Sequence, residues 1–204
     1  MKHLSIKDIE AFSHIYKINM MNSISGYKPA NLVATKSENG ISNVAVFSSV
    51  VHYGSSPAIL GFVMRPTTVV RNTYDNIKAT RYYTINAINE PIITDAHHTS
   101  AKYPSDVSEF DMTNLNEEYK NEFYAPFVKE SPLQIGMEFL EEHYIKANDT
   151  ILILGKVTDL YFKEEMLGSD GFLNLSKQKI AAINGLDTYM IAENYERLSY
   201  QRPK

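Results

Sequence analysis

The feature that most constrains the fold is a stretch rich in β-branched residues, from 21 to 64, that is cut repeatedly by turn signals. The cuts fall at Gly26, Asn39-Gly40, Gly54 and Pro57. Such alternation of β-branched runs with turn residues predicts short strands, which we place near 30–36, 42–51 and 58–64. Asn39-Gly40 favours positive φ and predicts a hairpin between the first two.

The rest of the chain predicts more strands and only short helices. Apolar spacing predicts an amphipathic helix within 8–18, and a short helix over 72–80 that Asn72 or Thr73 can cap. Further strands are predicted over 81–88, 135–148, 149–162 and Gly171–Leu175. Residues 91–132 are expected to form a long connection with one or two short helices, and the tail from 181 is expected to be irregular.

Six or more strands with few helices predict a mainly β protein with an antiparallel barrel. A doubly wound α/β fold would need helices between most strands, and its G-x-G-x-x-G turn appears nowhere in the sequence. With 204 residues, of which 44% are hydrophobic, the chain is expected to form one domain over 1–204.

Composition argues against several classes of function. A net charge of −4 is the wrong sign for a non-specific nucleic-acid binder. The absence of cysteine excludes disulfides, thiolate metal sites and thiol nucleophiles. No apolar run reaches the roughly 20 residues that cross a bilayer, and the N-terminus does not resemble a cleaved signal peptide. We therefore expect a cytoplasmic protein without a membrane segment.

The stretch from 61 to 77, GFVMRPTTVVRNTYDNI, gathers cationic and hydroxyl side chains beside the predicted helix start. Guanidinium groups, hydroxyls and the free N–H groups of a helix N-terminus together suit a phosphate dianion. The residues that supply them are Arg65, Thr67, Thr68, Arg71, Asn72 and Thr73. The alternative is that the arginines are solvated and the hydroxyls only cap the helix.

Two other segments allow a ligand contact. In a strand, Ser48 and Ser49 would point to opposite faces, and each needs a hydrogen-bond partner, either a ligand or a neighbouring backbone carbonyl. The polar residues before the first strand, from Lys28 through Pro29 and Ala30 to Asn31, could line a planar ligand or simply begin a strand at a barrel rim.

Other chemistry-bearing residues favour no site. His97-His98 lack the spacing of a metal site, and no G-x-S-x-G supports a serine hydrolase. Glu109 could cap a helix or form a salt bridge, although a solvated loop anchored by Phe110 explains the segment equally well. We therefore predict no metal and name no catalytic residue.

Four segments in order resemble the flavin reductase-like, FMN-binding split-barrel family, over roughly residues 20–190: GYKPANLVATKSENGISNVAVFSSV, SSPAILGFVMRP, RNTYDNIKATRYYTIN and AHHTSAKYPSDVSEFD. The resemblance implies a six-stranded antiparallel split β-barrel with a few short peripheral helices, a homodimer, and non-covalent FMN. The chain departs from the family at Val46, where Asn or Thr is frequent, and at 65–68, which replaces a Ser/Lys-rich phosphate segment.

The resemblance also implies a function and a set of cofactor-binding residues. The expected activity is reduction of flavin by NAD(P)H, with transfer to a small-molecule or protein acceptor. The alternative is a non-catalytic FMN-binding protein that acts as a flavin store, a sensor or an electron carrier. The candidate FMN contacts are Lys28, Pro29, Ala30, Asn31, Phe47, Ser48, Ser49, Arg65, Thr67, Thr68, Arg71, Asn72, Thr73 and Lys102.

Overall fold

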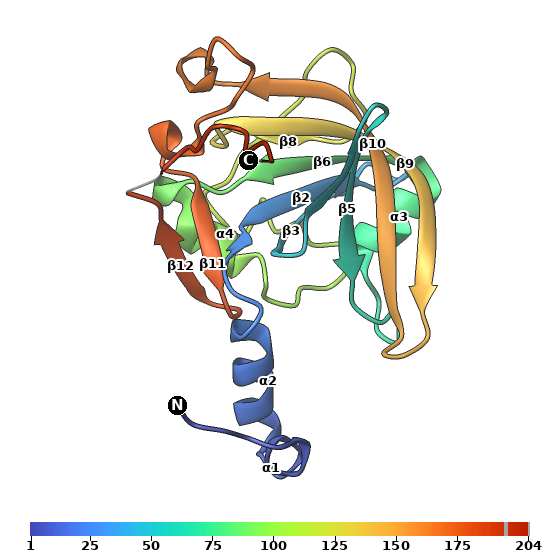
Figure 1. Ribbon diagram of the computed structural model, residues 1–204. Helices are drawn as coiled ribbons and strands as arrows, with labels where there is room; N and C mark the ends of the chain where they lie inside the picture. Colours follow the sequence, from blue (N-terminus) through green and yellow to red (C-terminus); the bar gives the residue numbers. More distant parts are fainter. Residues whose placement is uncertain (194–195, 204) are drawn as a thin grey trace.

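The computed structural model describes residues 1–193 and 196–203 and is built mainly from antiparallel strands (Figure 1). The main strands are β2 (Asn31–Lys36), β3 (Ser42–Phe47), β4 (Val51–Ser55), β5 (Ala58–Met64), β6 (Tyr82–Ala87), β9 (Leu133–Ile145) and β10 (Thr150–Phe162). Within the described residues they form one sheet in the order β3-β2-β6-β9-β10-β5-β4. The mainly β, antiparallel prediction is confirmed, with seven strands in this sheet in place of the expected six.

The long β9–β10 hairpin curves the sheet. The first part of β9 pairs with β6, whereas the first part of β10 pairs with β5. The β9–β10 ladder shifts register twice, at Leu154/Gly155, where β10 also pairs with β5, and at Val157/Asp159, opposite the part of β9 that pairs with β6. Because such bulges bend a strand and increase its twist, the two ends of the sheet turn toward each other. The predicted break near Asn148-Asp149 is confirmed, and Asp149 has a φ of 58° there.

Strand β2 lies between two apolar clusters, so every residue from Asn31 to Thr35 is buried. On one side, Val33 packs with Phe62, Ile77, Tyr83 and Met137 in the core that the curved sheet encloses. On the other side, Leu32 and Ala34 pack with Val44, Phe110 and Leu115. The second cluster exists because part of the 91–132 connection covers the outer face of the sheet.

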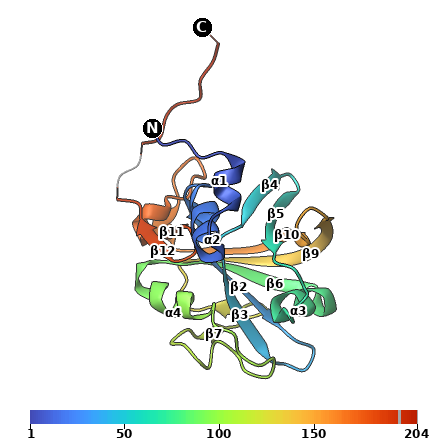
Figure 2. The same cartoon turned by 90° about the horizontal axis from the view of Figure 1, so that it is seen from below.

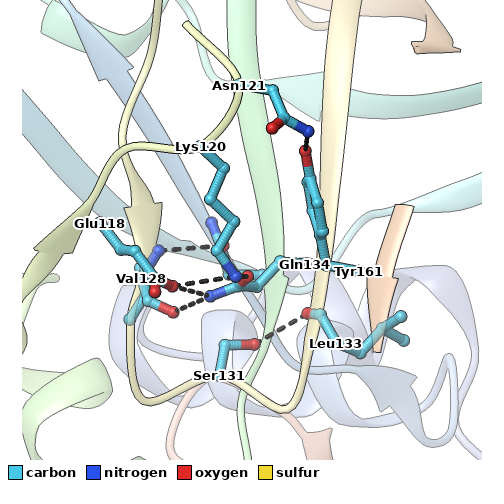
Figure 3. Close-up of polar contacts among 9 residues, drawn as sticks. Glu118, Lys120, Asn121, Val128, Ser131, Leu133, Gln134 and Tyr161 are labelled. Carbon is cyan, nitrogen blue, oxygen red and sulfur yellow. Dashed lines mark hydrogen bonds and ion pairs between the residues drawn. The ribbon is translucent and has the colours of Figure 1, made fainter. Parts of the chain in front are cut away.

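The connection contains η1 (Glu90–Ile92), α4 (Ile93–His98), β7 (Glu117–Glu118) and β8 (Phe127–Val128). Buried hydrogen bonds fasten it to β6: the Thr84 hydroxyl donates to the Pro126 carbonyl at 2.7 Å, and the Val128 N–H donates to Asn86 Oδ1 at 3.0 Å. Figure 3 shows a second attachment, in which Lys120 Nζ donates to Gln134 Oε1 at 2.6 Å and also lies 3.0 Å from Glu118. The connection is therefore a fixed layer of the fold.

A second sheet corrects the prediction of an irregular tail. β11 (Ala181–Asn184) and β12 (Thr188–Ile191) form a hairpin, and β1 (Lys28–Pro29) pairs with β11. Ala181 and Ile183 are buried in the outer cluster, a contact that depends on α4 and β2 and so has no local signal. The predicted strand at Gly171–Leu175 is wrong: Gly171 has a φ of +85°, Leu173 makes only an isolated bridge, and the region lies between η2 (Glu164–Met166) and η3 (Leu175–Gln178).

The N-terminal segment forms two helices, α1 (Ile6–Glu10) and α2 (His14–Ser23), in place of the single helix predicted within 8–18. Ser5 and Asp8 form a capping box that starts α1, and Ser13, with extended backbone, separates it from α2. Both helices project from the β-sheet body, downward in Figure 1 and toward the viewer in Figure 2.

Helix α3 (Asn72–Thr80) confirms the predicted helix over 72–80, but the predicted cap is wrong. Arg71 occupies the N-cap position and no side chain caps the helix. Thr73 instead accepts a hydrogen bond from Asn43, and Asn72 lies in the first turn.

No helix within 1–193 and 196–203 is long and apolar enough to span a bilayer. The same residues hold no group of three or more His, Cys, Asp or Glu side chains that could bind a metal ion.

Candidate functional site

The ends of β2, β3 and β5 meet at one place in the fold. Asn31, the first residue of β2, pairs with Phe47, the last residue of β3. Two residues later the Ser49 hydroxyl accepts from the Val63 N–H at 3.0 Å and donates to the Val63 carbonyl at 3.3 Å. The predicted segments 28–31 and 47–49 therefore lie together, next to the strand that leads into Arg65.

The contact between Ser49 and β5 also corrects the predicted strand over 42–51. The chain leaves β3 after Phe47 and begins β4 only at Val51, so Ser48 and Ser49 do not occupy opposite faces of one strand. Ser49 uses a backbone partner, which is one of the two partners that the sequence left open. Ser48 lies half-buried beside it.

The loop after β5 carries two cations that no carboxylate neutralises. Arg65, Thr67 and Thr68 are exposed, and Arg71 is half-buried with its Nε donating to the Pro66 carbonyl at 3.4 Å. Among the described residues, neither arginine forms an ion pair. Arg71 leads directly into α3, whose first N–H groups have no side-chain cap. Two guanidinium groups and a helix start thus remain available to an anion.

A cavity at the start of α3 has a different character. Asn72 lines a cavity of about 380 Å³ together with Asp75 and Asp106. Thr73 is buried, and its hydroxyl accepts from Asn43 Nδ2 at 3.0 Å. Because two carboxylates line this cavity, it repels a phosphate, and the Arg65 and Arg71 side is the one that suits an anion.

Where β2 and β3 end, the side-chain amide of Asn31 has a hydrogen-bond donor without an acceptor among the described residues. Its side chain is 8% exposed, and Nδ2 is buried without a partner in the part of the chain that the structure describes. A buried amide nitrogen without an acceptor costs free energy, since its hydrogen bonds to water are lost. A ligand carbonyl or ring nitrogen beside Phe47 would supply the missing acceptor.

The remaining predicted residues are placed as follows. Lys28 Nζ donates to the Asn22 carbonyl at 2.6 Å and to Ser25 Oγ at 3.2 Å, so it is tied to the end of α2. Pro29 is exposed, and Ala30 is buried in the outer cluster. Lys102 is exposed in the stretch after α4.

Glu109 is a buried carboxylate whose position the sequence did not indicate. It is 7% exposed, and its Oε2 accepts from the Val44 N–H on the free edge of β3 at 3.0 Å. Burial raises the pKa of this carboxyl, although the Val44 hydrogen bond opposes the shift. The expected solvated loop is wrong for Glu109, whereas the predicted anchoring role of Phe110 is confirmed by its burial. A local sequence signal for the burial of Glu109 is its position directly before Phe110, a buried aromatic residue.

Comparison with known proteins identifies the family. The family model described as flavin reductase like domain matches residues 27–183. An uncharacterized protein of Aquifex aeolicus (strain VF5) is 26% identical over 161 residues, which are 78% of this chain and 80% of that protein.

Solved structures show the same fold. The crystal structure of a candidate flavin reductase with a split barrel domain, from Shewanella frigidimarina NCIMB 400, superposes with a TM-score of 0.95 at 38% identity, covering 98% of this chain and 100% of that one. Nitrilotriacetate monooxygenase component B from Bacillus cereus has a TM-score of 0.83 at 15% identity, with 97% and 98% covered. At that identity the likeness concerns the fold alone. The chain therefore belongs to the flavin reductase like domain family, and the predicted split-barrel class is confirmed.

Proposed function

We propose that this protein binds FMN where β2, β3 and β5 end and α3 begins, and that NAD(P)H reduces the bound flavin for transfer to a further acceptor. Membership of the flavin reductase like domain family supports a flavin as the cofactor. The choice of FMN, the nicotinamide donor and the acceptor belong to the proposal.

The observation that carries the proposal is the pair of unpaired guanidinium groups at an uncapped helix start. Arg65 and Arg71 lie in one short loop, and within the described residues no carboxylate pairs with either. A phosphate monoester carries close to two negative charges and three acceptor oxygens. Guanidinium donors and the N-terminal amides of α3 complement both properties.

The residues at the other end suit an aromatic ring with polar edges. Phe47 offers an apolar surface, and Asn31 Nδ2 lacks an acceptor. When bound, the flavin supplies the redox chemistry, so that the protein needs to bind it, orient it and leave room for the reductant. Ser49 and Thr73, whose hydroxyls already have partners inside the fold, would contribute mainly by holding the backbone in place.

The proposed choice of FMN over FAD rests on the charge of the phosphate group that the loop would bind. One solved relative of the fold is described as an NADH:FAD oxidoreductase from Streptomyces globisporus, at 12% identity. The loop from Arg65 to Arg71 offers a terminal dianion two guanidinium groups, whereas the internal diphosphate of FAD carries no such terminal group. We therefore favour FMN.

The proposal includes two further points. The resemblance implies a homodimer, and a second copy of the chain would then lie close to the flavin. A cytoplasmic location stays a prediction.

The non-catalytic alternative, FMN binding without turnover, differs from the enzyme in one property, which is reduction of the bound flavin by a nicotinamide.

Two measurements test the proposal. Protein purified with its cofactor should show the absorption bands of oxidised flavin, and mass spectrometry of the released compound should identify FMN. Protein isolated without a cofactor should bind added FMN in a fluorescence titration. Anaerobic mixing with NADH or NADPH in a stopped-flow instrument should bleach those bands. Absence of flavin binding would reject the whole proposal, whereas tight FMN that neither nicotinamide reduces would select the non-catalytic alternative.

A further inference from the structure

A second cavity lies between helix α2 and the turn that joins β11 to β12, two elements that Figures 1 and 2 show side by side. Its volume is about 480 Å³, which is within the range of small-molecule sites in proteins. An aromatic ring, two side-chain amides, a carboxylate and a hydroxyl are among the groups that line it, from Tyr16, Asn19, Asn184, Asp187 and Thr188. Because these residues come from distant parts of the chain, no local pattern in the sequence predicts the cavity.

The side chain of Asn184 points to a ligand. Its Oδ1 is buried and has no hydrogen-bond partner among the described residues. A buried acceptor without a donor costs free energy, because its hydrogen bonds to water are lost. The backbone of Asn184 pairs with Thr188 across the hairpin, so the residue is held at the edge of the cavity. An N–H group of a ligand in the cavity would supply the missing donor.

The other groups in this cavity suit adenosine. Tyr16 is 51% exposed and offers an aromatic face on which a planar base can stack. Asparagine amides recognise adenine through its N6 amino group and N7, and N6 carries the N–H donor that Asn184 Oδ1 lacks. Within the part of the chain that the structure describes, Asp187 forms no ion pair, so its carboxylate can accept hydrogen bonds from ribose hydroxyls.

The cavity is connected to the ring end of the proposed FMN site through Lys28. Strand β11 pairs with β1, and Lys28 lies opposite the residue directly before Asn184. Three residues after Lys28 comes Asn31, whose amide nitrogen lacks an acceptor among the described residues. Lys28 Nζ donates to the Asn22 carbonyl and to Ser25, and no carboxylate of the described chain pairs with it. An ammonium group has three donors, so one remains for a diphosphate oxygen.

We propose that this cavity binds the adenosine half of the nicotinamide dinucleotide whose other half reduces the flavin. The identity of the ligand rests on the proposed function, whereas the adenosine site itself depends only on the cavity. Asp187 also decides between the two dinucleotides. A carboxylate accepts hydrogen bonds from the ribose hydroxyls of NADH and repels the 2′-phosphate of NADPH. The reductant is therefore NADH.

The first test is binding of ADP-ribose, which carries the adenosine and diphosphate groups but no nicotinamide, so that it binds without redox chemistry. Calorimetric titration of the protein with and without FMN measures its affinity. Asn184→Ala should weaken ADP-ribose about tenfold, since a hydrogen bond to a buried group is lost, and should bind FMN as the wild type does. Asn39→Ala, which changes an exposed asparagine that lines the other cavity, is the matched control and should bind ADP-ribose normally.

The second test concerns the choice of dinucleotide. In anaerobic stopped-flow mixing, the wild type should reach half of its maximal rate of flavin bleaching at a lower concentration of NADH than of NADPH. Asp187→Asn should reduce this preference by about threefold, as expected for one exposed charge. Asp106→Asn, an exposed aspartate that lines the other cavity, should keep the preference. A wild type that prefers NADPH, or an unchanged preference in Asp187→Asn, would overturn the role of Asp187.

The third test needs no variant and therefore covers an Asn184→Ala protein that fails to fold. Hydrogen exchange of the amides in 16–23 and 184–188 should become slower when ADP-ribose is added to the wild type. No binding of ADP-ribose, equal binding by Asn184→Ala and the wild type, or protection confined to other segments would each overturn the adenosine site. Flavin bleaching by NADH without protection of these amides would reject this site alone, whereas protection in a protein that does not bind FMN would reject only the proposed function.

Discussion

Two segments beside strand β3 use their polar residues in opposite ways. In the 91–132 connection, buried polar groups have partners inside the protein: Glu109 with Val44, and the Val128 N–H with Asn86. In the loop from Arg65 to Arg71, the guanidinium groups have no carboxylate partner among the described residues. The buried polar groups of the connection therefore stabilise the fold, whereas the two arginines of the loop remain available for a ligand.

The largest effect is expected at Asn86, where strand β6 holds the connection. Asn86→Ala removes the acceptor of the Val128 N–H and two hydrogen bonds donated by Nδ2 to the Leu32 carbonyl and the Thr84 hydroxyl. The buried N–H left without a partner, together with the cavity, should lower the free energy of unfolding by about 3 kcal/mol. Urea unfolding measures it, with Gln201→Ala as an exposed control. If Asn86→Ala lowered the free energy of unfolding by less than about 0.5 kcal/mol, as an ordinary surface substitution does, the connection would not depend on its buried hydrogen bonds.

The next largest effect is expected in the loop from Arg65 to Arg71 and concerns the affinity for FMN. Arg71→Ala should weaken FMN by about 1.5–3 kcal/mol, because a charge-assisted hydrogen bond is lost. The free energy of unfolding should fall by no more than about 1 kcal/mol, because the variant loses one hydrogen bond, to the Pro66 carbonyl. Fluorescence titration measures the affinity, with Arg202→Ala in the tail as the matched control and Arg71→Lys to separate charge from fork geometry. Unchanged affinity in Arg71→Ala would take this residue out of the site.

A smaller effect is expected from Glu109, as a dependence of stability on pH. Burial raises its pKa in the folded state above the ordinary value of a glutamate, so the folded state binds the proton more tightly than the unfolded state. The resulting stability is present below the unfolded pKa and is lost as pH rises through the folded pKa. Glu109→Gln retains an acceptor for the Val44 N–H but cannot ionise.

The difference in unfolding free energy between Glu109→Gln and the wild type should therefore increase as pH rises from 4 to 7, in favour of the variant. Denaturant unfolding at several pH values measures this difference, so the contributions of the other acids cancel. A constant difference over that range would mean that Glu109 ionises in the folded protein as easily as in the unfolded one.

The last prediction is of no change. Riboflavin lacks the phosphate, so Arg71→Ala and the wild type should bind riboflavin with equal affinity. Titration with riboflavin beside FMN measures this directly. An equal loss for both ligands would show that Arg71 shapes the pocket and does not contact the phosphate.

From the sequence alone, the strands β2, β5, β6, β9 and β10, the hairpin at Asn39-Gly40 and helix α3 could be predicted, because turn chemistry and hydrophobic periodicity act between neighbouring residues. The sequence also determined that Arg65 and Arg71 share one loop with a helix start. For the predicted FMN contacts, the sequence supplied the residue types, and their role stays a prediction.

Only the tertiary structure decided the features that join distant segments. The Ser49–Val63 contact ends β3 early, Glu109 reaches Val44 across 65 positions, and β11 becomes a strand because it pairs with β1. The structure likewise placed Asn31 beside Phe47 and left its amide nitrogen without an acceptor. The physical reason is the same in each case: burial and hydrogen bonding depend on which partner arrives from elsewhere in the chain, and local periodicity carries no information about that partner.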